Sequence, residues 1–349
     1  MKVESSTWGE TPSGEKITRF RLTNQHGQFV GLTDWGATLL EVVVPDREGK
    51  LANVNLMFEQ LSGYLGSHPH FGGTIGRFAN RIAQGRFAID GKVYELAINN
   101  GPNHLHGGEV SYDHRHWQAE PFDRGDAAGV RFTLIDPDGF EGYPGTVTVQ
   151  TEYTWNNQQE LTIRFTATTD AATHINLTNH SYWNLAGAGS GSAMQHIAAI
   201  EADQFLDVDA TLIPTGTFKD VADTPLDFRQ PTPLGARLDQ LPATNGYDHC
   251  YVLRGAAGQL RPAARVFDPV SGRGLEIETT QPGVQLYTAN HLPGNASSAS
   301  AGGHEAFCLE TQHYPDSPNQ PGFPTTLLRP GETLQQTTIH RFFHQTRKD

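Results

Sequence analysis

Short runs in which hydrophobic and polar residues alternate recur along most of this chain, separated by turn residues. The first three, between residues 17 and 46, read ITRFRLTN, QFVGLTDWG and ATLLEVVVPD. Alternation places every second side chain on one face of an extended strand, so this stretch predicts three successive strands. Similar runs predict strands at 130–135, 146–155, 161–169, 197–202, 250–253, 265–268, 274–279, 284–288, 306–310 and 333–343.

Several of the intervening turns predict hairpins. The Asp90-Gly91 pair in RFAIDGKVYEL is a two-residue loop between alternating runs, the strongest short-range hairpin signal. Residues 156–158 and 271–272 separate two further strand pairs. Helix signals are limited to a turn at 59–65 and about two turns at 232–240. Many short strands with so little helix predict an all-β fold, a large sandwich or barrel.

The chain shows no internal repeat and no linker, so we expect one domain spanning residues 1–349, although this is long for a single domain. The 37 glycines and 21 prolines agree with a fold rich in turns. The segment GNASSASAGG, residues 294–303, is of low complexity. We expect it to form a flexible surface loop that borders the mouth of a pocket.

Composition excludes several function classes. A net charge of −13 argues against nucleic acid or an anionic membrane as partner. Cys250 and Cys308 are the only cysteines, which leaves no disulfide framework and no cysteine-based zinc site. The N-terminal residues lack an apolar signal core and no run is long enough to span a membrane, so we expect a soluble, cytoplasmic protein. Residues 72–76 are glycine-rich but lead into no helical pattern, so phosphate binding is not expected there.

The stretch THINLTNHSYWNLAG, residues 173–187, departs from strand alternation because polar residues crowd around His180. Buried polar groups need partners, so such a run favours the wall of a wet pocket. His180 can move a proton near neutral pH, and Trp183 offers a flat apolar face for a ring-shaped ligand such as a sugar. The alternative is a core strand whose polar side chains bond to loop backbone. The residues alone leave both interpretations open.

Other stretches carry similar chemistry. In GRFANRIA, Asn80 and Arg81 are adjacent, so a turn would let both reach one ligand, whereas on a strand Arg81 is an ordinary surface cation. In NHLHGG, His104 and His106 are two residues apart and would share one face of a strand. That spacing suits metal binding, but no third ligand is near in sequence and we expect no metal.

Two acidic residues and one amide complete the set of candidates. In NGYDHCY, Asp248 follows a turn and could simply cap it; in FCLETQHY, Glu310 ends an apolar strand, where a charge is usually solvated. QPGVQLYT adds Gln285. None of the three points to a site by itself.

Together with WGATLLEVVVPDREG near the start, these stretches occur in the order and at roughly the spacing found in aldose 1-epimerases, also called galactose mutarotases. The resemblance covers about residues 10–343. It implies a large antiparallel β-sandwich of the galactose mutarotase type with an open, sugar-binding face. The sequence departs from the family in Trp183, where phenylalanine is common, and in the segment 294–303.

The resemblance also implies roles. Glu310 would be the general base and His180 the general acid, and His106 would assist at the sugar ring. Sugar hydroxyls would be held by Asn80, Arg81, Asp248 and Gln285. The implied reaction interconverts the α- and β-anomers of free aldohexoses such as glucose and galactose, without cofactor or metal. The expected partner is the sugar alone, with the protein a monomer or homodimer; the preferred aldose and the pathway are not implied.

Two alternatives use the same fold. An epimerase of hexose 6-phosphates would need a basic cluster for the phosphate, and among the motifs we find only Arg77 and Arg81. A non-catalytic sugar-binding protein would be favoured by loss of Glu310 or His180, and both are present.

Overall fold

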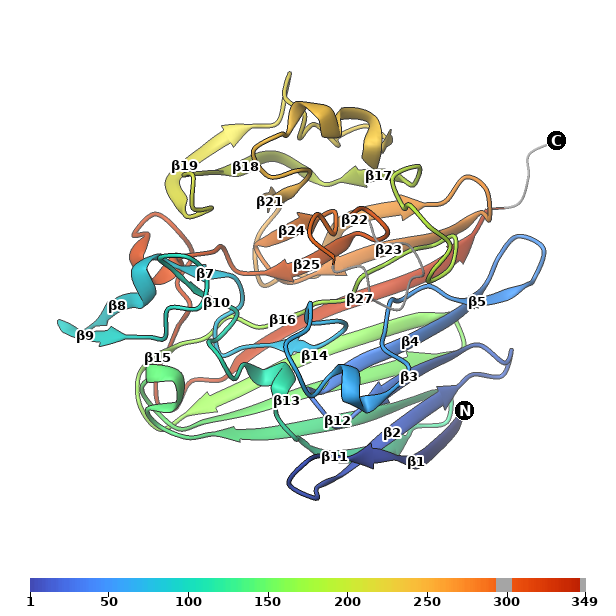
Figure 1. Ribbon diagram of the computed structural model, residues 1–349, viewed down its shortest axis with the longest axis horizontal. Helices are drawn as coiled ribbons and strands as arrows, with labels where there is room; N and C mark the ends of the chain where they lie inside the picture. The colour runs from blue at the N-terminus through green and yellow to red at the C-terminus, as the bar shows by residue number, and fades with distance from the viewer. Residues whose placement is uncertain (293–302, 346–349) are drawn as a thin grey trace.

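A computed structural model describes residues 1–292 and 303–345, and strands dominate it (Figure 1). The largest sheet has nine strands, all paired antiparallel. In spatial order they are β11 (Gln118–Asp123), β12 (Ala127–Asp136), β13 (Val147–Asn156), β14 (Glu160–Thr169), β27 (Leu334–His344), β23 (Arg273–Thr279), β22 (Arg261–Phe267), β17 (Ile197–Ile200) and β20 (Thr232–Pro233).

Two five-stranded sheets accompany it. One contains β1 (Lys2–Glu10), β2 (Lys16–Thr23), β3 (Phe29–Thr33), β4 (Thr38–Pro45) and β5 (Leu51–Asn53) in chain order. The other contains, in spatial order, β19 (Pro214–Asp220), β18 (Ala202–Val208), β21 (Asp248–Leu253), β24 (Gly283–Tyr287) and β25 (Cys308–Gln312). This second sheet carries two of the candidate acids.

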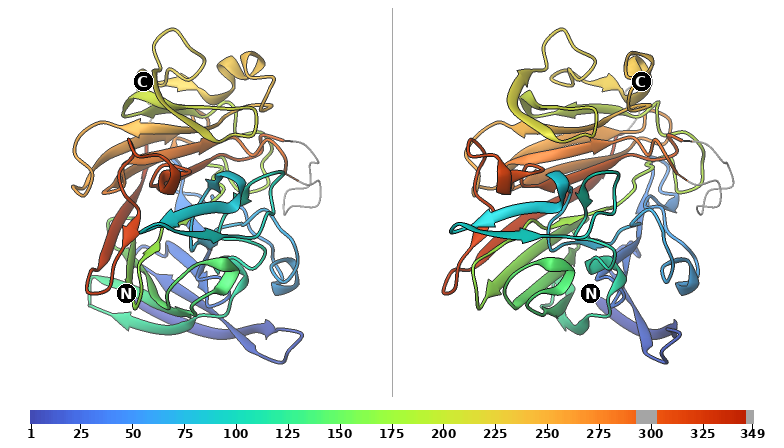
Figure 2. Two further views of the ribbon diagram at one scale, coloured as in Figure 1. Left: turned by 90° about the vertical axis from the view of Figure 1, so that its left-hand side faces the viewer. Right: turned by 60° about the vertical axis from the view of Figure 1, so that its left-hand side comes forward.

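Four short strand pairs complete the fold: β6 (Thr74–Ile75) with β16 (Thr178–Asn179), β7 (Arg81–Ile82) with β10 (His104–Leu105), β8 (Arg86–Ile89) with β9 (Lys92–Glu95), and β15 (Thr173–His174) with β26 (Leu327–Leu328). All helical turns in the described residues are of the 3₁₀ type: η1 (Leu61–Gly63), η2 (Ala83–Gly85), η3 (Tyr112–His114), η4 (Phe140–Gly142), η5 (Leu234–Gln240) and η6 (Ser317–Asn319). In both views of Figure 2, the cyan segment with β7 to β10 lies between the blue N-terminal sheet and the orange and red strands. The candidate residues at 80, 81 and 106 lie in or beside this segment.

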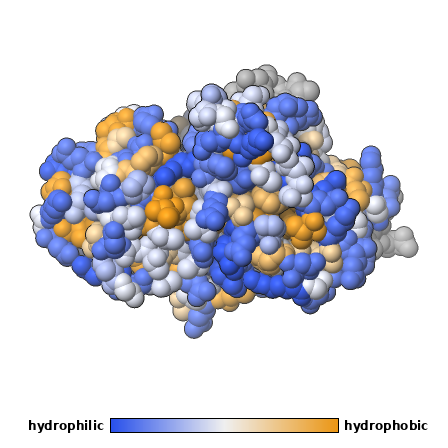
Figure 3. Space-filling view, turned by 90° about the horizontal axis from the view of Figure 1, so that it is seen from below, coloured by the Kyte–Doolittle hydropathy of each residue, from blue (hydrophilic) through white to orange (hydrophobic). Residues whose placement is uncertain are grey.

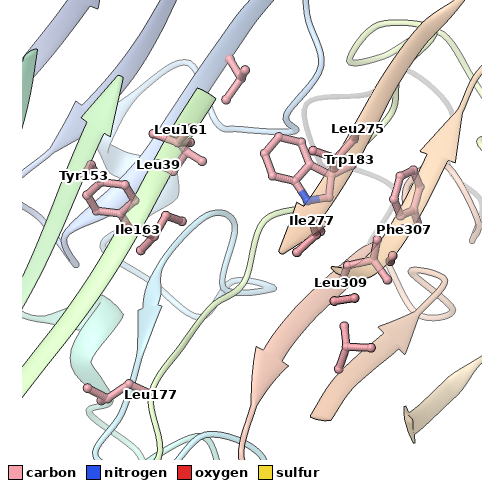
Figure 4. Packing of buried hydrophobic residues seen from close by; sticks show 14 of the residues in the cluster. Leu39, Tyr153, Leu161, Ile163, Leu177, Trp183, Leu275, Ile277, Phe307 and Leu309 are labelled. Carbon is pink, nitrogen blue, oxygen red and sulfur yellow. The ribbon is translucent and has the colours of Figure 1, made fainter. Parts of the chain in front are cut away.

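The core lies on one face of the nine-stranded sheet, because alternate residues of its strands are buried. Leu161 and Ile163 of β14 point inward, whereas Arg164 lies in an ion pair on the opposite face. Residues of both five-stranded sheets, such as Leu39 and Leu309, join the same buried cluster (Figure 4). The molecule is therefore an all-β sandwich in which two smaller sheets cover one face of the large sheet.

Most of the strand predictions are confirmed, including the hairpins at Asp90-Gly91, 156–158 and 271–272. The turn at 59–65 is confirmed as η1. The helix expected at 232–240 is confirmed in part: residues 232–233 form β20, and the helix that follows, η5, is of the 3₁₀ type and is interrupted by a non-helical Arg237. Strand β25 begins at Cys308 rather than 306.

Among the strands of six or more residues, four do not follow from the pattern: β1, β11, β18 and β19. β1, β11 and β19 are edge strands in which polar residues occupy both faces, so no alternation marks them. The segment 294–303 lies almost wholly outside the described residues. On the face seen in Figure 3, hydrophobic residues form separate small patches among hydrophilic ones. Within the described ranges, no helix is long and apolar enough to cross a membrane.

Candidate functional site

One pocket, with a volume of about 530 Å³, brings together residues from distant parts of the chain. Its lining consists of Ser67, His68, Pro69, His70, Asn80, Arg81, Leu105, His106, His180, Tyr182, Asp248, Tyr287, His291 and Glu310. Six of the seven residues singled out from the sequence are in this list. The seventh, Gln285, lies directly behind the lining.

The acidic half of the pocket is built on the sheet that contains β21, β24 and β25. Gln285 and Glu310 are direct cross-strand partners on β24 and β25. Gln285 donates a hydrogen bond from its Nε2 to Oδ1 of Asp248, at 2.6 Å. Nη2 of Arg81 lies 3.7 Å from Oδ2 of Asp248. Gln285 and Arg81 therefore orient the Asp248 carboxylate, which is a positioned acceptor rather than the cap of a turn.

Glu310 is a buried carboxylate, 3% exposed, and its Oε2 has no hydrogen-bond partner among the described residues. The nearest charged or titratable atom recorded is Nε2 of His180, at 3.6 Å. Burial raises the pKa of Glu310 well above its ordinary value; the charge of Asp248 adds to this, and Arg81 opposes it. A buried acceptor without a partner, facing a pocket, is suited to receive a proton or a hydrogen bond from a ligand.

Backbone hydrogen bonds to the neighbouring glycine-rich turn hold His180 in place. Its N–H donates to the carbonyl of Gly73 at 3.0 Å, and its carbonyl accepts from the N–H of Gly72 at 2.9 Å. Its ring stacks on that of Tyr182, with centroids 5.0 Å apart. Burial lowers the pKa of His180 to about 3, so the imidazole of the empty pocket is neutral near pH 7.

Asn80 and His106 fix one another. The N–H of Asn80 donates to Nδ1 of His106, and the N–H of His106 donates to the carbonyl of Asn80, both at 3.1 Å. Because Nδ1 accepts, the neutral ring carries its proton on Nε2. Both residues have positive φ, 67° for Asn80 and 53° for His106. The left-handed backbone at Asn80, directly before β7, lets both Asn80 and Arg81 line one pocket, so the sequence alternative in which the two reach one site is the one present.

Each of the two interpretations of the polar run around His180 is correct for some of its residues. Most of its side chains bond to loop backbone. Asn176 donates to the carbonyl of Ala79, Thr178 to that of Thr311, Asn179 to that of Gly72, and Asn184 to those of Gly191 and Glu305. The core interpretation is correct for these residues, and the pocket interpretation is correct for His180.

Two expectations from the sequence are wrong. Trp183 does not face the pocket; it is 1% exposed and lies in the core beside Leu275 and Ile277 (Figure 4). Its ring also packs against those of His340 and Phe342. His104 and His106 do not share a strand face, because β10 ends at Leu105 and the backbone at His106 turns left-handed. His104 instead bonds to the carbonyl of Ala97 and the hydroxyl of Tyr143.

Two groups of side chains have the spacing of a metal site: His68 with Asp113 and His114, and His106 with His180 and Glu310. A histidine ligand presents a lone pair to the metal and keeps a proton on its other nitrogen. His68 and His106 each accept a backbone N–H on Nδ1, so the nitrogen that faces the group carries the proton. These hydrogen bonds disfavour a metal, and the absence of one stays a prediction.

A second hollow, of about 470 Å³, is lined by charged residues that satisfy one another. Arg254 pairs with Asp203 and Arg229 with Asp227, each at 2.7 Å. Arg237 donates to the carbonyl of Asp227 at 2.6 Å. Because Arg254 and Arg229 are already paired with carboxylates, this hollow offers less to a ligand than the pocket around Glu310.

Sequence reasoning missed several residues of the pocket wall, above all His70 and His68. Their signal is the histidine density of the run HPH just before the glycine-rich stretch. Tyr182 and Tyr287 were also missed, because aromatic residues in strands are ordinarily core residues.

Comparison with known proteins agrees across the whole chain. A family model described as aldose 1-epimerase matches residues 18–341. Galactose mutarotase from Bos taurus is 45% identical over 346 residues, which cover 98% of this chain and 99% of that protein. Aldose 1-epimerase from Escherichia coli K12 is 34% identical over 339 residues, covering 95% and 96%. The crystal structure of galactose 1-epimerase from Lactobacillus acidophilus superposes with a TM-score of 0.88 at 28% identity, covering 98% and 99%.

Proposed function

This chain belongs to the aldose 1-epimerase family, and from that premise we propose that it interconverts the α- and β-anomers of free aldohexoses such as glucose and galactose. The observation that carries this proposal is the pair formed by Glu310 and His180. A partnerless carboxylate oxygen and an imidazole nitrogen lie 3.6 Å apart at one pocket wall. Opening a hemiacetal requires such a pair, since one group removes a proton while the other supplies one.

The reaction can be written with these two groups alone. The Glu310 carboxylate takes the proton of the C1 hydroxyl, protonated His180 gives a proton to the ring oxygen, and the bond between C1 and that oxygen breaks. Rotation about C1–C2 presents the other face of the aldehyde, and the ring closes with both proton transfers reversed. Each group then regains its starting state. Well-placed acid and base groups contribute roughly 10²–10⁴-fold each.

The pair needs one proton in total for this chemistry. The raised pKa of Glu310 and the lowered pKa of His180 place that proton on the carboxyl group. Its transfer to His180 generates the reactive carboxylate and imidazolium. Because the two forms differ only in where one proton lies, they belong to the same protonation state of the pair.

The remaining pocket residues hold the sugar in this proposal. Asp248, oriented by Gln285 and Arg81, accepts from ring hydroxyls. Asn80 fixes His106, whose Nε2–H donates near the ring oxygen. We also propose that the protein acts as one domain of residues 1–349, in the cytoplasm, as a monomer or homodimer without nucleic-acid or membrane partners.

The phosphate alternative is less well supported. Arg81 is the single arginine or lysine among the described lining residues, and it already faces Asp248. Arg77, the other candidate, is buried away from the pocket and bonded to Asp136 at 2.6 Å. The Asp248 carboxylate in the same pocket also repels a phosphate.

Polarimetry tests the proposal directly. Freshly dissolved α-glucose and α-galactose should reach their equilibrium rotation faster with the protein than without it, while α-glucose 6-phosphate should be unaffected. The Glu310→Gln variant at equal concentration controls for nonspecific acceleration. An unchanged rate with both free sugars would refute the proposed activity.

A further inference from the structure

A buried carboxylate behind the pocket wall holds one of the histidines that face the sugar site. Asp113 is 1% exposed and accepts a hydrogen bond from Nδ1 of His70 at 2.7 Å. The hydroxyl of Ser111 and Nδ1 of His114 approach its other oxygen. Burial acts to raise the pKa of Asp113, but the interactions with His70 and His114 outweigh it and hold the pKa well below its ordinary value. The carboxylate is thus ionised and oriented toward His70.

The backbone around His70 is built for this contact. His70 itself has a positive φ of 63°, a conformation that non-glycine residues adopt rarely. A side chain at Gly73 would lie 2.5 Å from Cβ of Asp113, so the carboxylate fits only because this position is glycine. Gly72 and Gly73 also make the backbone hydrogen bonds that hold His180. One glycine-rich turn therefore positions both His70 and His180.

Nε2 of His70 and Nε2 of His106, two neighbouring nitrogens of this wall, are complementary. In its neutral form His70 donates through Nδ1 and presents a lone pair at Nε2, and no hydrogen bond among the described residues uses that atom. His106 accepts through Nδ1, so its Nε2 presents a proton. The two ring centroids are 5.0 Å apart, and His70 stacks near His180 at 5.8 Å. A neighbouring acceptor and donor match a sugar hydroxyl, which both donates and accepts.

The pocket has two sides between which Glu310 and His180 meet. Asp248 and Gln285 lie on the Glu310 side of this pair, whereas His70 lies on the His180 side, with its ring centroid 5.8 Å from that of His180. If O1 is at Glu310 and the ring oxygen is at His180, the sugar continues in two directions. The C2 and C3 hydroxyls extend toward Asp248, whereas C5 and its C6 hydroxymethyl group extend past His180 toward the other histidines.

We infer that His70 accepts a hydrogen bond from the C6 hydroxyl of the aldohexose and that Asp113 is its positioning residue. The inference rests on the proposed function, since the sugar is placed by the roles of Glu310 and His180. A site built to bond one hydroxyl discriminates against sugars that lack it, because its polar group is then left unpaired. His70 is in this way a specificity-determining residue for hexoses over their 6-deoxy analogues and over pentoses.

The test compares kcat/KM for D-galactose, 6-deoxy-D-galactose and 2-deoxy-D-galactose. For the wild type, loss of the C6 hydroxyl should lower kcat/KM by roughly 5- to 150-fold. His70→Phe should lower kcat/KM for galactose and for the 2-deoxy sugar by a similar factor. It should leave kcat/KM for the 6-deoxy sugar within about threefold of the wild-type value. His70→Asn provides a second variant, because asparagine tolerates the left-handed backbone. His26→Phe, at an exposed histidine outside the pocket, is the matched control and should change nothing.

Asp113→Asn tests the positioning role. It should lower kcat/KM for galactose less than His70→Phe does, mainly by raising KM. In a protein that already carries His70→Phe, Asp113→Asn should cause little further loss of kcat/KM. Equal losses for galactose and its 6-deoxy analogue in both His70 variants would overturn the inference, as would a wild type that does not discriminate at C6. A wild type that accelerates none of the three sugars would instead refute the proposed function.

Discussion

Glu310 and Asp136 are both buried carboxylates, but their surroundings differ completely. Asp136, at the end of β12, accepts hydrogen bonds from Arg77 at 2.6 and 2.8 Å, from Arg115 at 2.6 Å and from the hydroxyl of Tyr112 at 2.9 Å. Glu310 has an oxygen with no partner among the described residues. Burial alone therefore does not mark a functional acid; the distinguishing feature is an unmet hydrogen-bonding capacity that faces a pocket.

The strongest test of this comparison is a variant that replaces the Glu310 carboxyl group by a neutral amide. Glu310→Gln keeps the shape and removes the base, so kcat should fall by roughly 10²–10⁴ with KM much less affected. Stability should be unchanged or increased, because no hydrogen bond to Oε2 from the described residues is lost and the amide is neutral without taking up a proton. Steady-state mutarotation and urea unfolding of the same sample measure both quantities.

His180→Asn should have a comparable effect on kcat, since the acid and base act in one step. The double variant should be little worse than the poorer single variant, as expected for groups that act as a unit. A single variant that keeps near-wild-type kcat would remove Glu310 or His180 from the mechanism, even if the protein proves to be a mutarotase.

The second prediction concerns Asp136, for which we expect the opposite profile. Asp136→Asn leaves the buried guanidinium of Arg77 without its counter-charge, which should lower the free energy of unfolding by about 3–5 kcal/mol. The kcat of the folded fraction should be unchanged. Glu276→Gln, which removes a partly exposed ion-pair partner of Arg265, is the matched control and should cost about 0–1 kcal/mol. A large loss of kcat in folded Asp136→Asn would show that the two carboxylates are not functionally distinct.

The third prediction is the pH dependence of kcat/KM, which should be bell-shaped with a wide plateau. The pair is active with one proton. Below a pKa of about 3, His180 takes up a second proton while Glu310 keeps its own, and no base remains. Above the raised pKa of Glu310 the pair holds no proton and no acid remains. The rate should fall about tenfold per pH unit beyond either limit. If kcat/KM for a sugar begins to fall already between pH 5 and pH 4 as the pH is lowered, the base is instead a carboxylate with an ordinary pKa.

The fourth prediction concerns Asp248, a carboxylate intermediate between the two extremes because it has partners and also faces the pocket. Asp248→Ala should weaken binding by about 1–3 kcal/mol, seen mainly as a higher KM. Asp207→Ala, at an exposed ion pair with Lys219, is a control of the same residue type. Unchanged kcat and KM for every sugar tried would remove Asp248 from the site.

The smallest effect expected is that of chelation, which should be none. EDTA should leave the mutarotation rate unchanged, since the reaction needs only the two proton carriers. Dialysis into metal-free buffer, followed by addition of Zn²⁺, is the complementary measurement. Activity that disappears with EDTA and returns with zinc would contradict the tautomer assigned to His106.

The sequence predicted the parts of the fold in which local pattern and tertiary packing agree. The hairpin of β13 and β14 is marked by inward-facing residues such as Tyr153 and Ile163 and by a short turn. Edge strands such as β1 were not predicted, because neither face of such a strand is consistently apolar. Trp183 was misplaced because the residue pattern does not specify whether an aromatic residue beside a polar run faces ligand or core.

The candidate site could be predicted only in part from the same information. Six of the seven proposed residues line one pocket and Gln285 supports it, but it was the resemblance to a family that selected them, since each is ordinary when taken alone. The pairing of His70 with Asp113 joins residues 43 positions apart and depends on the absence of a side chain at Gly73. Such a contact depends on the folded backbone, so no local sequence pattern predicts it.

The position of β27 has a consequence for how the protein is made. This strand lies in the middle of the nine-stranded sheet, between β14 and β23. Before residues 334–344 are translated, β14 and β23 each present an unpaired row of backbone donors and acceptors to solvent or to a neighbouring nascent chain. Synthesis of this single strand closes both edges at once, so a ribosome that stalls before it leaves a product with two sites for aggregation.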